Sequence, residues 1–173
     1  MTTDYGQRIV LALQAIRQLH ADTSRLLVDF GKTVGAGWIS VFGNYATRDL
    51  TYNVNADFWM AEGVYRYWAR KENLGTVKAL TVCFFGRGIK EPLLLVSQLK
   101  YRMDGASEIK SVCKEWDLWQ LFFDWSDQTI ADDMLSFAGA DKGRIESANL
   151  VAKPLYAIAQ LDDVAAMMNR VDL

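Results

Sequence analysis

The stretch TVKALTVCFFGRGIKEPLLLVSQLKYR, residues 76–102, decides the fold. It holds two apolar runs, 76–86 and 93–102, that are separated by a loop containing Gly and Pro. Runs rich in β-branched and aromatic residues between such breakers predict strands, and the short connection predicts an antiparallel pair. Because the LLLV segment at 93–96 does not alternate with polar residues, we expect this strand to be covered on both faces.

Upstream of these strands, residues 4–32 carry the apolar pattern of one long amphipathic helix. Asp4 is a suitable N-cap, and Gly35 and Gly37 follow the expected end of the helix. Seven positions also have heptad spacing: Ile9, Leu13, Ile16, His20, Thr23, Leu27 and Phe30. Two of these are polar, so packing on a sheet or a partner is favoured over a coiled coil.

The remaining elements complete an α+β pattern. In chain order, we expect one or two strands in 38–54, a helix over 57–72, a helix over 107–125 that begins at Ser107, a short helix within 128–138, a strand in 150–161 and a C-terminal helix from Asp162 or Asp163. The sequence thus predicts a single α+β domain over 1–173. A mixed or mainly antiparallel sheet would pack with the long N-terminal helix and two aromatic-rich helices.

Composition narrows the class of protein. The 173 residues are 51% hydrophobic and 23% charged, which is typical of a folded domain. Acidic residues number 21 and basic residues 19, so the net charge of −2 argues against a nucleic-acid partner. With two cysteines, no signal-peptide pattern and no apolar run of about 20 residues, the sequence predicts a cytoplasmic protein without a membrane partner.

The residues that usually carry catalysis are scarce. The single histidine, His20, lies at the edge of the apolar stripe of the long helix, and two cysteines cannot complete a four-ligand zinc site with it. GRG at 86–88 and GAG at 35–37 do not extend into phosphate-binding motifs. Asp117 and Asp124 share a helix face that is expected to be solvated. We therefore expect no catalytic residue, no metal and no cofactor, and a protein that is not an enzyme is favoured.

Two helices carry more aromatic surface than a single buried face requires. The predicted partner-binding residues are Trp59, Arg66, Arg70, Trp116, Trp119, Phe122 and Trp125. Trp beside Arg is typical of interface hot spots, although a covering loop or a second layer inside the same chain would also bury these side chains. The favoured function is protein–protein contact, either as a homo-oligomer or as an adaptor, inhibitor or immunity-type protein.

The alternative function is a small-ligand-binding, anion-binding or enzymatic domain. Its pocket would lie between the sheet and the aromatic helices, with Arg87, Lys100 and Arg102 facing an anionic group. A metal-dependent nuclease ranks last. Gln98 and Lys100 have suitable spacing for one, but no Asp lies in the preceding strand.

Overall fold

The computed structural model describes residues 4–42, 63–84, 90–103, 108–114, 117–125, 134–138 and 144–172. Within these ranges, six strands form one antiparallel sheet in the order β1-β2-β3-β4-β6-β5, which confirms the α+β class. The elements are α1 (Tyr5–Thr33), β1 (Trp38–Ser40), β2 (Gly63–Arg70), β3 (Asn73–Cys83), β4 (Leu93–Tyr101), α2 (Ile109–Val112), α3 (Asp117–Trp125), β5 (Leu135–Ala138), β6 (Ile145–Pro154), a 3-10 helix (Leu155–Ala157) and α4 (Leu161–Val171).

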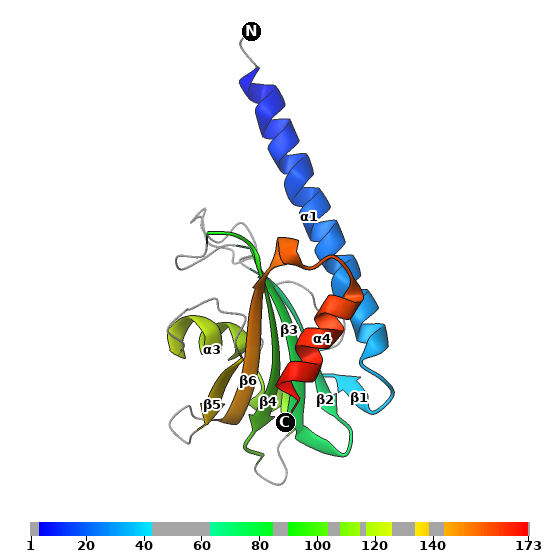
Figure 1. Cartoon of the computed structure of the whole chain (residues 1–173), viewed down its shortest axis with the longest axis vertical. Coiled ribbons are helices and arrows are strands. Elements are labelled where there is room, and N and C mark those ends of the chain that lie inside the picture. Colours follow the sequence, from blue (N-terminus) through cyan, green and yellow to red (C-terminus); the bar gives the residue numbers. More distant parts are fainter. Residues whose placement is uncertain are drawn as a thin grey trace.

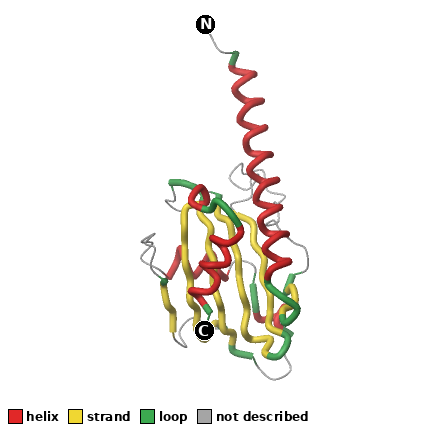
Figure 2. Tube along the Cα trace, turned by 45° about the vertical axis from the view of Figure 1, so that its right-hand side comes forward, coloured by secondary structure: helices red, strands yellow, loops and turns green. Residues whose placement is uncertain are grey.

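Helices cover both faces of the sheet (Figures 1 and 2). The lower half of α1 and all of α4 lie on one face, whereas α2 and α3 lie on the other. Successive side chains of β4 point to opposite faces of the sheet. Leu93 and Leu95 belong to the core on the α3 side, and Leu94 and Val96 belong to the core on the α1 side. The expectation that the LLLV segment is covered on both faces is therefore confirmed.

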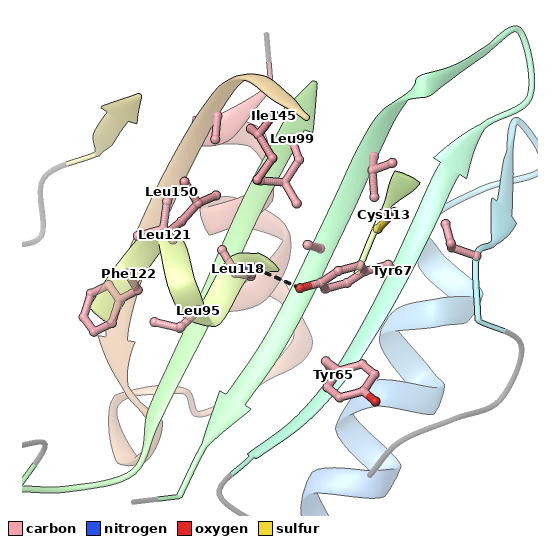
Figure 3. Packing of buried hydrophobic residues seen from close by; sticks show 14 of the residues in the cluster. Tyr65, Tyr67, Leu95, Leu99, Cys113, Leu118, Leu121, Phe122, Ile145 and Leu150 are labelled. Carbon is pink, nitrogen blue, oxygen red and sulfur yellow. Dashed lines mark hydrogen bonds between the residues drawn. The ribbon is translucent and has the colours of Figure 1, made fainter. Parts of the chain in front are cut away.

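The core beneath α3 combines aliphatic side chains with buried tyrosines (Figure 3). Leu118, Leu121 and Phe122 of α3 pack against the sheet, and each is at most 1% exposed. The backbone N–H of Leu118 donates a 3.0 Å hydrogen bond to the hydroxyl of Tyr67. This bond satisfies one of the free N–H groups of the first turn of α3 and fixes the helix over β2.

Helix α1 and the central strand pair agree with the sequence predictions. The side chain of Asp4 accepts a 3.1 Å hydrogen bond from the N–H of Gly6 at the start of α1. Past its end, Gly35 has a φ of +92°, a conformation that favours glycine. Strands β3 and β4 pair antiparallel, with Ala79 opposite Ser97.

The predicted helix over 57–72 is wrong for the residues from Gly63 onward, which form strand β2. Tyr65 and Tyr67 face α3, whereas Trp68 faces α1. Aromatic and β-branched residues fit a pleated surface that is covered on both sides, and β1 and β3 supply hydrogen-bond partners at both edges. The part of the predicted range before Gly63 lies outside the described residues.

The predicted helix over 107–125 is interrupted. Cys113 ends α2 in an extended conformation, with φ −71° and ψ 134°. The carboxylate of Asp117 then accepts a 2.8 Å hydrogen bond from the N–H of Lys114, just before α3 begins. Residues 115 and 116 lie outside the described ranges.

Two later predictions also need correction. Within 128–138, the residues from Leu135 form strand β5 instead of a helix, because they pair along β6. The strand predicted in 150–161 starts earlier, at Ile145, and ends at Pro154, where a 3-10 helix follows. Proline has no N–H to continue the strand ladder.

Candidate functional site

Helix α1 has one apolar face along its whole length, but the sheet covers only the second half of that face. Leu27 and Phe30 are 1% and 3% exposed, and the ring of Phe30 lies 5.5 Å from that of Trp68. Each buried side chain of α1 has a counterpart 18 residues earlier, which is five helical turns. Ile9 stands at the angle of Leu27, and Ala12 stands at the angle of Phe30.

The first half of α1 projects past the end of the sheet (Figure 1). Every residue from Tyr5 to Ala15 is exposed. Tyr5 is 78% exposed, Ile9 46% and Leu13 61%. With Ala12 and the half-buried Ile16, these residues form the uncovered stripe of α1, on the same side as the buried residues farther along.

Covering an exposed apolar stripe lowers the free energy of the protein in water. Burying a Leu or Ile side chain is worth about 1.5–3 kcal/mol. Helical segments of this length are marginal in water without tertiary contacts, so the projecting half of α1 lacks the packing that stabilises the other half. The stripe is therefore an apolar part of the described surface that contact with another molecule would cover.

A groove of about 350 Å³ adjoins the stripe where α1 meets the body of the protein. Leu19 and Leu26 of α1 form one wall, and Leu155, Ile158 and Leu161 contribute the other. Asp22, Arg25 and Asp29 also line it, and Arg25 lies 3.3 Å from Asp22. The groove thus combines an apolar floor with charged groups of both signs.

The two arginines predicted to bind a partner lie on β2 instead of a helix. Both lie on the α1 side of the sheet: Arg66 lies beside Gly31 of α1, and Arg70 lines a groove together with Trp38 and Asp172. The Arg66 guanidinium lies 5.3 Å from the centre of the Trp68 ring, and burial lowers its pKa. Arg70 is exposed and lies 3.7 Å from Glu72.

Two of the predicted aromatic contact residues at 116–125, Trp119 and Phe122, have described side chains, and both pack toward the core. Phe122 packs in the α3-side core, so in this fold it does not present a contact surface. Trp119 is half-buried, with its ring 5.0 Å from that of Phe123. Trp59, Trp116 and the side chain of Trp125 lie outside the described residues.

The structure describes two of the three residues of the ligand-binding alternative. Lys100 lies 3.4 Å from Glu146, and Arg102 is exposed. Arg87 lies outside the described residues.

A separate groove of about 350 Å³ on the α1 side contains Arg70 and Lys78 together with two acids, Glu72 and Asp172. Lys78 lies 5.0 Å from the Trp38 ring and 2.9 Å from Asp172. Two bases face two acids, so this groove does not concentrate positive charge for an anion.

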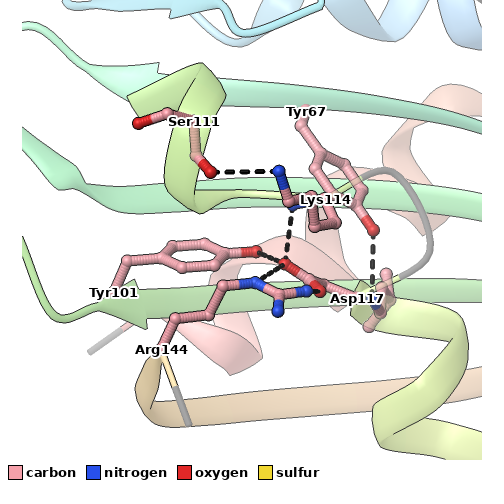
Figure 4. A network of polar contacts seen from close by, with 7 residues as sticks. Tyr67, Tyr101, Ser111, Lys114, Asp117 and Arg144 are labelled. Atoms are coloured by element: carbon pink, nitrogen blue, oxygen red, sulfur yellow. Dashed lines mark hydrogen bonds and ion pairs between the residues drawn. The ribbon is translucent and has the colours of Figure 1, made fainter. Parts of the chain in front are cut away.

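The sequence analysis missed a buried polar network around Asp117 (Figure 4). Asp117 is 1% exposed instead of solvated. Its carboxylate pairs with Arg144 and accepts hydrogen bonds from the Tyr101 hydroxyl at 2.7 Å and from the N–H of Lys114. Because Tyr101 ends β4 and Arg144 precedes β6, the network ties the start of α3 to the sheet.

Beside this network, burial raises the pKa of the Cys113 thiol and of the Tyr67 and Tyr101 hydroxyls. All three stay protonated in the folded protein at pH values where the unfolded chain begins to lose these protons. Their contribution to stability is complete below the unfolded pKa values. It is lost as the pH rises through and beyond them.

We therefore expect stability to fall in alkali, first through Cys113, because a free thiol titrates near pH 8.5 and tyrosine near pH 10. Between about pH 9 and 10, wild type should lose about 1 kcal/mol more of its free energy of unfolding than Cys113→Ala loses. Urea unfolding at each pH measures this difference. If the free energy of unfolding had the same pH dependence in wild type and in Cys113→Ala, the raised pKa of the Cys113 thiol would be contradicted.

Among the described helices, none combines the length and the apolarity needed to cross a bilayer. Within the described ranges, no three His, Cys, Asp or Glu side chains gather as metal ligands. Comparison of the chain with protein-family models, curated proteins and solved structures gives no match.

Proposed function

We propose that this protein works by protein–protein contact, with the uncovered stripe of α1 as the contact surface and a second copy of the chain as its first partner. One observation carries the proposal: the apolar face that packs on the sheet at Leu27 and Phe30 continues, uncovered, through Ile9 and Leu13. Large exposed apolar surfaces on folded proteins mark sites of interaction.

The alternatives receive less support from the described residues. Lys100, one of the cationic side chains named for ligand binding, faces Glu146, and the groove that contains Arg70 and Lys78 also contains two acids. Phe122 and Phe123 of α3 lie in the core, and the half-buried Trp119 packs against it. An adaptor or inhibitor would use the same α1 surface on a different protein.

The proposal predicts that charge on the stripe separates the assembly without unfolding the chain. Ile9→Glu with Leu13→Glu should give a monomer, because each copy would bring two carboxylates to an apolar contact. Light scattering after size-exclusion chromatography measures the mass. Both positions are exposed in the isolated chain, so circular dichroism should show an intact fold.

A charge-matched control uses the opposite side of the same helix segment. Gln7→Glu with Gln14→Glu adds the same two charges at exposed positions away from the stripe, and should leave the mass of the wild-type assembly unchanged. A monomeric wild type at all accessible concentrations would contradict self-association and leave only a different protein as partner. Equal effects of both double variants would show that net charge, and not the stripe, controls assembly.

A further inference from the structure

We propose that the groove between α1 and residues 155–161 binds a small uncharged amphiphile, a molecule with an apolar chain and one hydroxyl group that hydrogen-bonds to Thr23. The inference goes beyond the proposed function, because it concerns a small ligand in the groove and not a contact on the uncovered stripe. Its basis is the apolar lining of the groove together with a buried hydroxyl group that has no hydrogen-bond partner among the described residues.

The walls of the groove suit an apolar chain. Leu19 and Leu26 of α1 line one side, and Leu155, Ile158 and Leu161 line the other. All five side chains are half-buried, so each keeps apolar surface that a ligand can cover. The volume of about 350 Å³ lies within the range of ligand pockets, which is about 300–1,000 Å³. A short alkyl chain between these walls would leave water on both sides, which is favourable.

Thr23 lines the same groove and supplies the polar group. Its residue is 3% exposed, and its hydroxyl oxygen has no hydrogen-bond partner within the part of the chain that the structure describes. Thr33, farther along α1, shows the usual arrangement, because its hydroxyl donates a 2.8 Å hydrogen bond to the carbonyl oxygen of Phe30. Thr23 makes no such bond to its own helix. A buried hydroxyl without a partner destabilises the protein, and a ligand oxygen at this point would remove that cost.

The charges beside the groove favour a ligand without a charge of its own. The Asp22 carboxylate lies 3.3 Å from the Arg25 guanidinium and also accepts hydrogen bonds from the side-chain amide of Gln18. The Asp29 carboxylate lies 2.7 Å from the Lys32 ammonium. These charges are balanced within α1, so a charged head group would lose water without gaining an unpaired opposite charge. A hydroxyl group needs only one or two hydrogen bonds, which Thr23 can supply.

The melting temperature of the protein without ligand tests whether the Thr23 hydroxyl is unpaired. Thr23→Val keeps the shape of the side chain and removes the hydroxyl, so it should raise Tm by about 2–4 °C. Thr33→Val is the matched control, because it removes a hydroxyl that has a partner and should not raise Tm. Differential scanning calorimetry measures both. A lower Tm for Thr23→Val would show that the hydroxyl has a partner within the protein, and would overturn the proposal.

Titration with 1-hexanol tests the binding itself, with NMR of the Leu and Ile methyl groups as the readout. The methyl signals of Leu26 and Ile158 should shift and reach saturation, because both side chains line the groove. Thr23→Val should raise the dissociation constant of 1-hexanol about tenfold, which is the value of one hydrogen bond. Thr23→Ser keeps the hydroxyl and should stay within about twofold of wild type, as should Thr33→Val.

Each outcome of the titration supports or overturns the proposal. Saturable shifts at the groove that weaken in Thr23→Val and persist in Thr23→Ser support it. The absence of saturable shifts at the groove overturns it, and so do shifts confined to Ile9 and Leu13, which would place the alcohol on the uncovered stripe. Equal dissociation constants for wild type and Thr23→Val would show that Thr23 does not bind the hydroxyl of the ligand, and would also overturn it. Self-association is measured separately by light scattering, so either proposal can fail alone.

Discussion

Replacing Asp117 with alanine is expected to lower the free energy of unfolding by about 3 kcal/mol, because the change removes one partner of a buried ion pair. The carboxylate accepts hydrogen bonds from Tyr101 and from the N–H of Lys114, and it pairs with Arg144. All three donors lose their acceptor in the variant. The Arg144 side chain is 36% exposed, so its charge can turn toward water, which places the effect at the lower end of the usual range for buried pairs.

Urea unfolding of wild type and Asp117→Ala measures this loss. Glu146→Ala is the matched control, since it removes a carboxylate from an exposed pair with Lys100 and should cost less than about 1 kcal/mol. Asp117→Asn keeps the shape and one acceptor oxygen but removes the charge, and should fall between the two. If Asp117→Ala lay within about 1 kcal/mol of wild type, the network would not hold α3 to the sheet.

The parts of the fold that were predicted correctly are those with a local signal. The uninterrupted apolar run at Leu93–Val96 predicted a strand buried on both faces, and the helical repeat from Ile9 to Phe30 predicted α1. Both patterns depend on neighbours a few residues away. The sequence could not show where along α1 the sheet ends, because the apolar repeat is the same on both sides of that point.

The prediction of a helix over 57–72, where Gly63–Arg70 form β2, was wrong for a physical reason. Val64, Tyr65 and Trp68 are spaced as on one helix face, yet the same residues also suit a strand that is covered on both sides. Periodicity alone does not separate these cases. Gly63 adds a tertiary requirement, since a side chain there would come within 2.6 Å of the Val82 carbonyl oxygen of β3.

The network around Asp117 could not be predicted for a different reason. Asp117 and Arg144 are 27 residues apart, and only the pairing of β4 with β6 brings the start of α3 close to Arg144. An aspartate at a helix start is ordinarily a solvated cap. Here it lies beneath the first turn of α3 instead, and no local pattern distinguishes the two situations.

The second large effect is expected at Leu27, and its comparison with Leu13 tests the contact surface directly. Leu27→Ala should lower the free energy of unfolding by about 2–5 kcal/mol, because it opens a cavity beneath α1. Leu13→Ala removes the same atoms from an exposed position and should cost less than about 0.5 kcal/mol in the dilute protein, where alanine also favours the helix.

If the uncovered stripe of α1 is a contact surface, the difference between Leu13→Ala and Leu27→Ala depends on the protein concentration. Association stabilises the folded chain only where the folded copies bind one another, so its contribution grows with protein concentration. Urea unfolding of wild type at about 1 µM and about 100 µM should therefore differ, and Leu13→Ala should reduce that difference. Leu27→Ala should shift both curves by a similar amount, because its main cost arises within one chain. If Leu13→Ala matched wild type at both concentrations, Leu13 would contribute nothing to association.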